Sequence, residues 1–536
     1  MAVRTTGAKV FPTALAAGVL IAIGLSLVFS VSWASQSPPV HAPQLTETEQ
    51  RGRQIYLKGT SPSGIDIIAV LGTGETQVPA ATLACGNCHG LGGLGIPEGG
   101  VSPSDLRWES LTRPYEVTTP SGRKHGPYAD STLKRAVTMG LDPAGNTLEG
   151  AMPRFRMSLD DANALVAYIK KLGHTLDPGL TDTSILIATI APPAGPLTDT
   201  GKAVVAALQA YLDDLNDRGG LYGRRLVLRV ATTLTKAGVR AFIRDENVFA
   251  VISPIVAGSE KELLPLFEED QIPLIGPLTY LPRLGYPVNR HIFYLYTGLD
   301  GQARALCQFA AKKLNATGVA LVVPAQGLAA GLPAVVRERC SVLNLKLVAD
   351  IALAGDHFDA SRLVRQLSGA GAATIIFLGS ADQSVQLASA AARIGWRPNL
   401  LLIGSLEGQQ LFDVAGSFQG KTFVAYPTLP SDWSPDRMKL FAAMAESHHL
   451  STNHMASQIS ALSSAEILIE GLRRAGKDLS REKLVDQLEG LYDYDTGLTP
   501  GITYGPNRRV GALGAYVVLL DPVNKRLESA GWIPLN

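Results

Sequence analysis

Cys85-Gly86-Asn87-Cys88-His89 decides how the first part of this 536-residue chain is read. Two thiols three positions apart, followed at once by an imidazole, form Cys-x-x-Cys-His, the attachment signature of a c-type haem. The thiols of Cys85 and Cys88 would form thioethers with the two haem vinyl groups, and His89 would bind the iron as proximal ligand. The pentad therefore predicts one covalently attached haem.

Two other sites use cysteines at this spacing. A structural zinc site needs four ligands in two clusters, and no second Cys/His cluster at ligand spacing follows the pentad. A thioredoxin-like dithiol is expected at the start of a helix that follows a strand, whereas this one is followed by a glycine-rich stretch, residues 90–95. Haem attachment remains the favoured interpretation.

The N-terminus carries the export signal that haem attachment outside the cytoplasm requires. Arg4 and Lys9 precede an uncharged apolar stretch from about Ala14 to Ala34, and small residues at Ser32 and Ala34 suit a signal peptidase. The stretch approaches the ~20 residues that span a bilayer. Residues 1–36 are therefore predicted to be a signal peptide or an uncleaved N-terminal anchor, with the rest of the chain in the periplasm.

Charge and composition exclude several classes of function. The 48 basic and 47 acidic residues leave a net charge of +1 with no basic block, so nucleic acid is not an expected partner. Neither a Gly-x-Ser-x-Gly elbow nor a His-Glu-x-x-His helix occurs, so an electron carrier or binding protein is favoured over an enzyme. Cys307 and Cys340 remain outside the pentad, and they are either a disulfide or two buried thiols that never meet.

The residues around the pentad predict a small helical domain over residues 43–173. Leu45 to Leu57 has helical spacing, with Thr46 as cap. A last helix starts at the capping sequence Ser158-Leu159-Asp160-Asp161. Gly52 is expected to let these two helices approach closely at Tyr168.

This region resembles the monohaem class I cytochrome c family, from about Leu45 to Gly173. The resemblance rests on the pentad with Gly90, on Tyr128-Ala129-Asp130 and on Met152-Pro153-Arg154-Phe155. It implies an all-α domain in which Met152 is the second axial ligand of a haem that carries electrons. It also implies that the carbonyl of Pro103 accepts the Nδ1–H of His89.

Three other side chains are rivals for the sixth iron position. Met139 and Met157 are nearby methionines, and His125 would give bis-histidine ligation. Met152 itself has a plainer alternative as a methionine that fills the core.

Beyond a Pro- and Gly-containing linker at residues 174–183, the hydrophobic period changes. Short apolar strands alternate with helices in two successive series, which predicts parallel βαβ units with helices on both faces of each sheet. The expected architecture is a two-lobed, doubly wound α/β domain over residues 184–536. The lobes are placed at roughly 184–298 and 299–422, with later segments crossing back.

This second part resembles the type I periplasmic binding proteins, the branched-chain amino acid group of ABC-transporter receptors, from about Ser184 to Asp521. The motifs that carry the resemblance are Asp217-Arg218-Gly219-Gly220-Leu221-Tyr222-Gly223-Arg224-Arg225, Pro273-Leu274-Ile275-Gly276-Pro277, Phe377-Leu378-Gly379-Ser380-Ala381-Asp382 and the segment Thr499–Val510. The resemblance implies a polar small-molecule ligand held between lobes that close by hinge motion. The alternative is a doubly wound domain without a ligand.

The resemblance also implies candidate ligand-binding residues. Family members bind a ligand carboxylate through hydroxyl side chains and backbone N–H groups, but Val256 and Ala257 stand at the matching positions, so only backbone donors near Gly258 and Ser259 are retained. Thr279 or Tyr280 lies near the second carboxylate contact. In lobe two, Glu407 resembles the acid that pairs a ligand ammonium, and an ordinary surface glutamate is the alternative.

Two functions follow from these expectations. The first is a periplasmic electron-transfer protein with one covalent haem, fused to a small-solute-binding module and served by a redox partner such as a dehydrogenase or oxidase. The second is an ABC-transporter receptor for an amino acid or amide-like solute, working with a permease, in which the haem is a sensor or accessory.

Overall fold

The computed structural model describes residues 45–535, except for 73–75, 91, 96, 98, 120, 174–175, 325–330, 354–357, 408, 415 and 478. The predicted signal or anchor segment, residues 1–36, lies outside the described residues. Among the helices that are described, none is long and apolar enough to cross a membrane.

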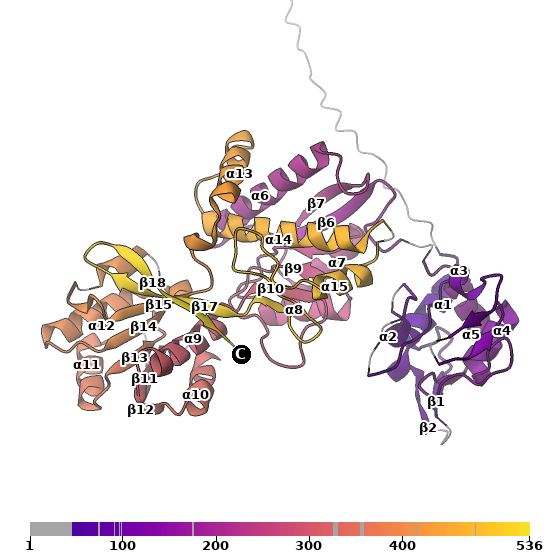
Figure 1. Ribbon diagram of the computed structural model, residues 1–536, viewed down its shortest axis with the longest axis horizontal. Helices are drawn as coiled ribbons and strands as arrows, with labels where there is room; N and C mark the ends of the chain where they lie inside the picture. The colour runs from indigo at the N-terminus through magenta and orange to yellow at the C-terminus, as the bar shows by residue number, and fades with distance from the viewer. Residues whose placement is uncertain are drawn as a thin grey trace, which may run out of the picture. The chain divides into compact units, whose positions relative to one another are not determined.

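The N-terminal domain, residues 45–173, is built around two packed helices, α1 (Glu47–Lys58) and α5 (Leu159–Ile169) (Figure 1). The predicted caps are confirmed, because the hydroxyl of Thr46 accepts from the N–H of Glu49 and that of Ser158 accepts from Asp161. Gly52 lies at the crossing, where a Cβ would overlap the carbonyl oxygen of Ala164 and press on Tyr168. The absence of a side chain at Gly52 is what sets the helix spacing.

The rest of this domain is short elements joined by long loops. They are η1 (Ala80–Leu83), α2 (Cys85–His89), α3 (Trp108–Leu111), α4 (Asp130–Met139), β1 (Ile68–Leu71), β2 (Thr76–Pro79), β3 (Val117–Thr118), β4 (Lys124–His125) and β5 (Arg154–Arg156). The all-α expectation missed a small antiparallel sheet of order β2-β1-β5. Its central strand is buried at Ala69 and Val70, and Ala69 belongs to the same core cluster as the buried residues of α1 and α5.

Lobe one of the C-terminal domain is a six-stranded parallel sheet of order β16-β10-β9-β8-β6-β7. Its elements are β6 (Ser184–Ile190), α6 (Thr198–Asp217), β7 (Arg225–Ala231), α7 (Lys236–Asp245), β8 (Ala250–Ile252), α8 (Glu260–Glu269), β9 (Leu274–Ile275) and β10 (Ile292–Tyr296). Parallel strands need crossover connections, and the helices supply them on both faces.

Lobe two is a seven-stranded sheet of order β12-β11-β13-β14-β15-β17-β18, in which β17 and β18 run antiparallel. Its elements are α9 (Gly298–Lys312), β11 (Gly318–Pro324), α10 (Leu332–Val342), β12 (Lys346–Leu353), α11 (Ala360–Gly369), β13 (Thr374–Phe377), α12 (Ala381–Arg393), β14 (Asn399–Ile403), three short 3₁₀ turns at η3 (Gly404–Leu406), η4 (Gln409–Asp413) and η5 (Gly416–Phe418), and β15 (Thr422–Tyr426). Strand β11 shows why the sheet is covered twice. Val319 and Leu321 pack with α9 and α10, whereas Ala320 and Val322 pack with α11 and α12.

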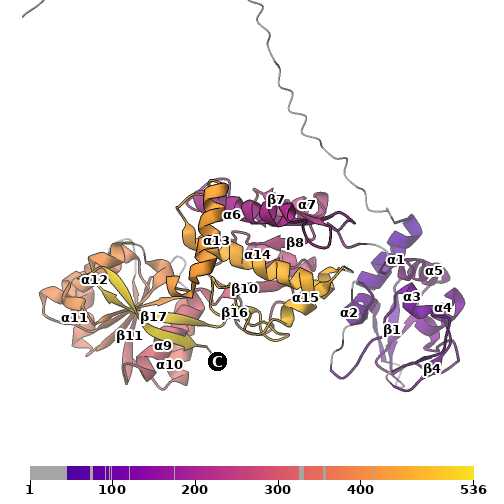
Figure 2. The ribbon, with the colours of Figure 1, turned by 45° about the horizontal axis from the view of Figure 1, so that its top comes forward.

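The chain then crosses back between the lobes. After η6 (Pro430–Asp432), helices α13 (Pro435–Ser447), α14 (Met455–Ala475) and α15 (Arg481–Glu489) follow, and α14 packs beside α6 of lobe one (Figure 2). Strand β16 (Val510–Ala512) joins the sheet of lobe one, while β17 (Gly514–Asp521) and β18 (Arg526–Pro534) join lobe two. Only Leu513 separates β16 from β17, so the two sheets share a nearly continuous strand.

Cys307 of α9 and Cys340 of α10 are both free and buried in one core cluster of lobe two. The hydrogen bond between the two thiols, together with burial, raises the pKa of Cys307 well above its ordinary value. The two thiols meet without a disulfide, so neither alternative from the sequence holds as stated.

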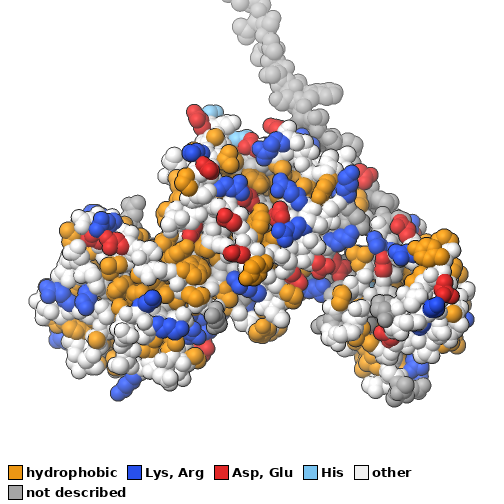
Figure 3. Space-filling view, viewed as in Figure 1, with side chains coloured by type: hydrophobic (Ala, Val, Ile, Leu, Met, Phe, Trp, Pro, Cys, Tyr) orange, Lys and Arg blue, Asp and Glu red, His pale blue; other side chains and the backbone are white. Residues whose placement is uncertain are grey.

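The surface carries both signs of charge. On the face drawn in Figure 3, Lys and Arg side chains are interspersed with Asp and Glu over both lobes. This mixed pattern agrees with the near-balance of 48 basic and 47 acidic residues.

Candidate functional site

The pentad forms a single helical turn, α2, directly after the 3₁₀ turn η1. The backbone N–H of Gly90 closes the turn on the carbonyl of Gly86, and the buried hydroxyl of Tyr56 donates to the carbonyl of Gly90 over 2.7 Å. Helix α1 therefore holds the residue that follows the pentad, Gly90, through a buried hydrogen bond. Burial raises the pKa of Cys85 to about 12, which is the opposite of what a redox-active thiolate needs.

His89 is buried, and the carbonyl oxygen of Ser104 lies 2.9 Å from its Nδ1. Burial lowers the pKa of His89, which favours the neutral imidazole that binds metals. A proton held on Nδ1 leaves Nε2 free as a ligand atom. The predicted partner, Pro103, is wrong by one residue, because the carbonyl of Pro103 packs instead against Gly95, whose φ is +89°.

Both thiols and His89 line one cavity of about 420 Å³ inside the N-terminal domain. Met152 lines the same cavity, contributed by the turn before β5. The rest of the wall is largely apolar, supplied by Leu106, Leu111, Leu133, Val137, Phe155, Leu165 and Ile169. An apolar cavity with two thiols, an imidazole and a thioether on its wall has the donor set that a c-type haem requires.

The three rival axial ligands differ in position. Met139 is 61% exposed at the end of α4, and Met157 packs against the core of the domain; the described lining of the cavity includes neither. His125 does line the cavity, with Nδ1 2.8 Å from the carbonyl of Gly126. Met152 and His125 are therefore the two candidates with access to the cavity.

Arg123 gives the cavity a cationic group. One guanidinium nitrogen, Nη1, pairs with the fully buried carboxylate of Asp142 at 2.8 Å. The Nε–H of Arg123 is buried and has no hydrogen-bond partner among the described residues. A buried donor without an acceptor is uncommon in folded proteins, and a haem propionate would satisfy it.

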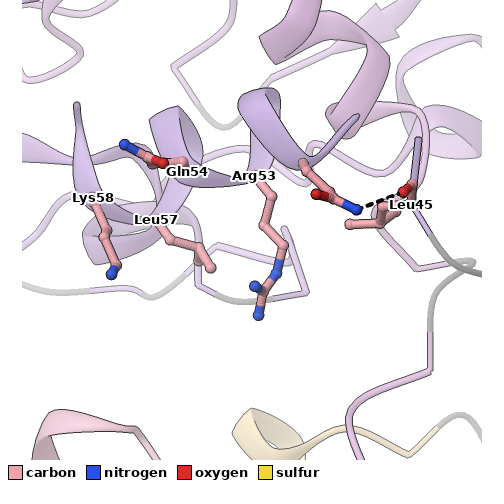
Figure 4. A pocket seen from close by; sticks show the side chains of 6 residues that line it. Leu45, Arg53, Gln54, Leu57 and Lys58 are labelled. Atoms are coloured by element: carbon pink, nitrogen blue, oxygen red, sulfur yellow. Dashed lines mark hydrogen bonds between the residues drawn. The ribbon is translucent and has the colours of Figure 1, made fainter. Parts of the chain in front are cut away.

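A second hollow of the N-terminal domain lies along the outer side of α1 (Figure 4). Its lining is Leu45, Gln50, Arg53, Gln54, Leu57 and Lys58, and the side chain of Gln50 donates to the carbonyl of Leu45. None of these lining residues carries a thiol, imidazole or thioether, so this hollow lacks the donors that haem iron needs.

The candidate ligand residues of lobe one meet around a side chain that the sequence analysis did not single out. The carboxylate of Glu260 accepts from the N–H of Gly258 at 2.8 Å, the hydroxyl of Thr279 at 3.0 Å and the N–H of Tyr280 at 3.2 Å. Gly258 follows β8, and Thr279 and Tyr280 follow β9, so two loops at the carboxyl ends of adjacent parallel strands converge on this carboxylate. The predicted residue Ser259 is not among the donors, since its N–H bonds the carbonyl of Val256.

Ser253 marks the same edge of the sheet. It directly follows β8, has φ of +45° and is fully buried. Its hydroxyl has no hydrogen-bond partner among the described residues. A left-handed non-glycine residue with an unpaired polar group is typical of functional edges.

In lobe two, Glu407 follows η3 and is partly buried. Its Oε1 accepts from the hydroxyl of Ser384 on α12 at 2.8 Å, while Oε2 is buried without a partner among the described residues. Burial raises the pKa of Glu407 to about 7, although the hydrogen bond from Ser384 opposes this. Glu407 is therefore not an ordinary surface glutamate.

Three residues of these candidate sites were missed from the sequence: Ser104, Arg123 and Glu260. Ser104 and Glu260 each directly follow a residue that was considered, Pro103 and Ser259. Arg123 lies between Gly122 and Lys124 in a stretch without a motif, so only the unpaired Nε draws attention to it.

Fold and cavity together define the class: a haem-binding helical domain joined to a two-lobed α/β binding domain. The sequence pattern of the periplasmic binding protein family matches residues 184–521, and that of cytochrome c matches residues 74–173. The chain belongs to the periplasmic binding protein family and carries a cytochrome c domain in front of it. These assignments imply haem c binding and a periplasmic location.

Curated relatives resemble the second domain. The Leu/Ile/Val-binding protein BraC3 of Rhizobium johnstonii is 21% identical over 61% of this chain and 89% of its own length. The Leu/Ile/Val-binding protein homolog 3 of Brucella melitensis is 24% identical over 54% of this chain and 79% of its own length.

Solved structures show the same fold. A branched-chain amino acid ABC transporter protein from Thermus thermophilus with bound valine superposes with a TM-score of 0.52, at 18% identity over 65% of this chain and 96% of that one. A fatty acid ABC transporter substrate-binding protein from Thermomonospora curvata gives 0.51, at 19% identity over 66% of this chain and 93% of that one. At this level of identity the likeness concerns the fold, and the two proteins are named with chemically different ligands, valine and a fatty acid.

Proposed function

We propose that this protein is a periplasmic electron-transfer protein with one covalently attached c-type haem, fused to a module that binds a small polar solute. The observation that carries the first half is the cavity in which Cys85, Cys88, His89 and Met152 share one wall lining. These residues would hold a c-type haem, which would supply a one-electron iron couple there, and the Met152 thioether would keep its potential relatively high.

The chain's own residues have distinct tasks in this proposal. Cys85 and Cys88 would hold the porphyrin edge through thioethers, and the neutral imidazole of His89 would present Nε2 while the Ser104 carbonyl fixes the ring. Met152 would offer its thioether from the turn before β5. Arg123 would donate its Nε–H to a propionate, and the apolar wall would exclude water from the remaining surface.

The second half of the proposal concerns the two-lobed domain. Its relatives are named for binding Leu, Ile and Val, and the match spans most of their length. We infer a small polar solute, amino acid or amide-like, as ligand and an ABC permease as the partner that receives it. A dehydrogenase or oxidase of the periplasm is the expected redox partner of the haem.

A receptor in which the haem is a sensor or accessory is the second candidate. It is favoured by the extent of the binding domain, which occupies residues 184–521 of the chain. Deletion of the chain separates the two: the first candidate predicts impaired electron flow, whereas the second predicts loss of solute import with respiration unchanged.

The haem half is tested on the full chain produced in a strain competent in cytochrome maturation. A pyridine haemochrome spectrum should report one c-type haem per chain, and denaturing gels should retain the haem. Colourless protein whose Cys85 and Cys88 remain open to alkylation would remove the electron-transfer half of the proposal.

The axial ligand is tested by Met152→Ala. The oxidised spectrum should lose its low-spin methionine–iron signature, whereas Met139→Ala, which alters an exposed methionine, should leave it intact. An unchanged spectrum in Met152→Ala would move the sixth ligand elsewhere, with His125 as the next variant to make.

A further inference from the structure

Glu260 occupies a set of donors in lobe one that has the makeup of a carboxylate receptor. Two backbone N–H groups and one hydroxyl converge on its two oxygens, and Glu260 itself is 9% exposed. The hydroxyl of Thr279 also accepts from the N–H of Leu281 at 3.0 Å, so its single proton is directed to Glu260. Every donor in the set is therefore in use.

A helix cap alone does not account for this arrangement. Glu260 is the first residue of α8, where a carboxylate is favoured by the helix dipole. However, its partners lie outside that helix, in the loop before α8 and in the loop after β9. Both loops stand at the carboxyl ends of parallel strands, which is where open α/β sheets bind their ligands.

An incoming carboxylate would meet two obstacles here. It would find the N–H groups of Gly258 and Tyr280 and the hydroxyl of Thr279 already satisfied, and it would face the negative charge of Glu260. Two carboxylates brought into contact repel each other, and a desolvated anion without hydrogen-bond donors is strongly disfavoured. A ligand with hydrogen-bond donors fits better, because a carboxylate has about four acceptor positions and three are used.

Lobe two contributes a second carboxyl group. Oε2 of Glu407 is buried without a partner among the described residues. Each lobe thus contributes a carboxyl group: Glu407 was itself marked by the sequence as a ligand contact, and Glu260 bonds to marked residues of lobe one.

We propose that Glu260 is a built-in occupant of the carboxylate receptor of lobe one, and that the solute is a small amine or amide that offers N–H donors and carries no carboxylate. The solute class rests on the proposed solute-binding function, whereas the self-occupied receptor rests on lobe one alone.

The receptor is tested by chemical rescue in the full haem-loaded chain. Glu260→Ala removes the carboxylate and opens space, so acetate should raise its melting temperature by about 2 °C or more over an equal concentration of chloride. Wild type should show no such difference. Absence of an acetate-specific rise in Glu260→Ala would overturn the self-occupied receptor.

Two variants control for other causes. Glu260→Gln keeps the space filled, so acetate should not stabilise it. Glu262→Ala removes an exposed glutamate from the same first turn of α8 and should likewise show no acetate-specific rise. An equal rise in Glu262→Ala would mean that acetate acts elsewhere and would overturn the assignment.

The solute class is tested on wild type with leucine and leucinamide, which differ only in carboxylate against amide. The amide should give the larger thermal shift at equal concentration, and a larger shift with leucine would overturn the inferred class. If no compound in a screen of amino acids, amines, amides and small alcohols shifts the protein, the solute-binding function and the solute class both fall. The acetate result would still decide the receptor.

Discussion

The cavity of the N-terminal domain and the donor set of lobe one are both receptors, but they differ in what satisfies them. In the cavity, no described residue bonds Nε2 of His89, and Nε of Arg123 is buried without a partner among those residues. In lobe one, the donors around Glu260 are already bonded to the chain's own carboxylate. A sequence motif thus indicates where a site lies, but the hydrogen-bond partners of its polar atoms show whether those atoms are available to a ligand.

The largest expected effect is on haem attachment in the cavity of the N-terminal domain. Cys85→Ala with Cys88→Ala should abolish covalent haem completely, because no thiol is then left on the cavity wall to form a thioether. Haem-stained denaturing gels measure this. The matched control is Cys307→Ala with Cys340→Ala, which changes the buried pair of lobe two and should keep full haem content. If covalent haem remained after loss of Cys85 and Cys88, the cavity of the N-terminal domain would not be the haem receptor that is contrasted with lobe one.

The next effect concerns the helix pair that supports the cavity. Gly52→Ala would drive a methyl group into the carbonyl of Ala164, forcing α5, which carries the wall residues Leu165 and Ile169, away from α1. Overpacking of this kind costs about 3 kcal/mol. Urea unfolding followed at the haem absorbance should show this loss in the free energy of unfolding of the N-terminal domain.

Gly150→Ala is the control for that substitution, since a Cβ at Gly150 meets no atom within 4 Å. The unfolding of the C-terminal domain should not change in either variant. A Gly52→Ala protein as stable as wild type would mean that the α1–α5 contact does not define the cavity.

Local signals explain what the sequence could predict. The caps at Thr46 and Ser158 and the alternation of apolar strands with helices are each encoded within a few residues, and both are confirmed. The pentad is equally local, and the cytochrome c domain that it indicated is matched over residues 74–173. The two-lobed α/β class follows from the alternation of strands with helices, because parallel strands require crossover helices.

Contacts between residues far apart in the chain explain what the sequence could not predict. The sheet of the N-terminal domain joins Ile68 to Arg156, far apart in the chain, and no short pattern announces that register. The acceptor for His89 lies one residue beyond the predicted one because a loop conformation, rather than a motif, decides which carbonyl turns inward. Glu260 gains its role only when loops after β8 and β9 converge.

A smaller effect on stability is expected when one of the donors around Glu260 in lobe one is removed. Thr279→Val keeps the shape of the side chain but removes the hydroxyl that donates to Glu260, and a hydrogen bond to a charged group contributes about 1.5 kcal/mol. Chemical denaturation of the C-terminal domain should show a loss of that size. Ser259→Ala is the control, since the hydroxyl of Ser259 makes no capping bond to α8, and it should change stability by less than about 0.5 kcal/mol. Equal losses of stability in both variants would mean that the hydrogen bond from Thr279 to Glu260 makes no particular contribution.

The smallest effect concerns Glu407 of lobe two. Its Oε2 is buried without a partner among the described residues, as Nε of Arg123 is in the haem cavity, whereas both oxygens of Glu260 in lobe one accept hydrogen bonds. The pKa of Glu407 is about 7 in the folded protein against an ordinary 4.5, so the proton favours the fold. This stabilisation is complete below about pH 4.5 and is lost as the pH rises through 7. Glu407→Gln mimics the protonated form and should therefore gain stability over wild type between pH 5 and 8, by about 1 kcal/mol after allowance for partial exposure. Melting curves across that range measure the gain, with the N-terminal domain's transition as internal reference. A difference that stays constant with pH would mean that Glu407 is ionised and satisfied, and that lobe two is closed like lobe one.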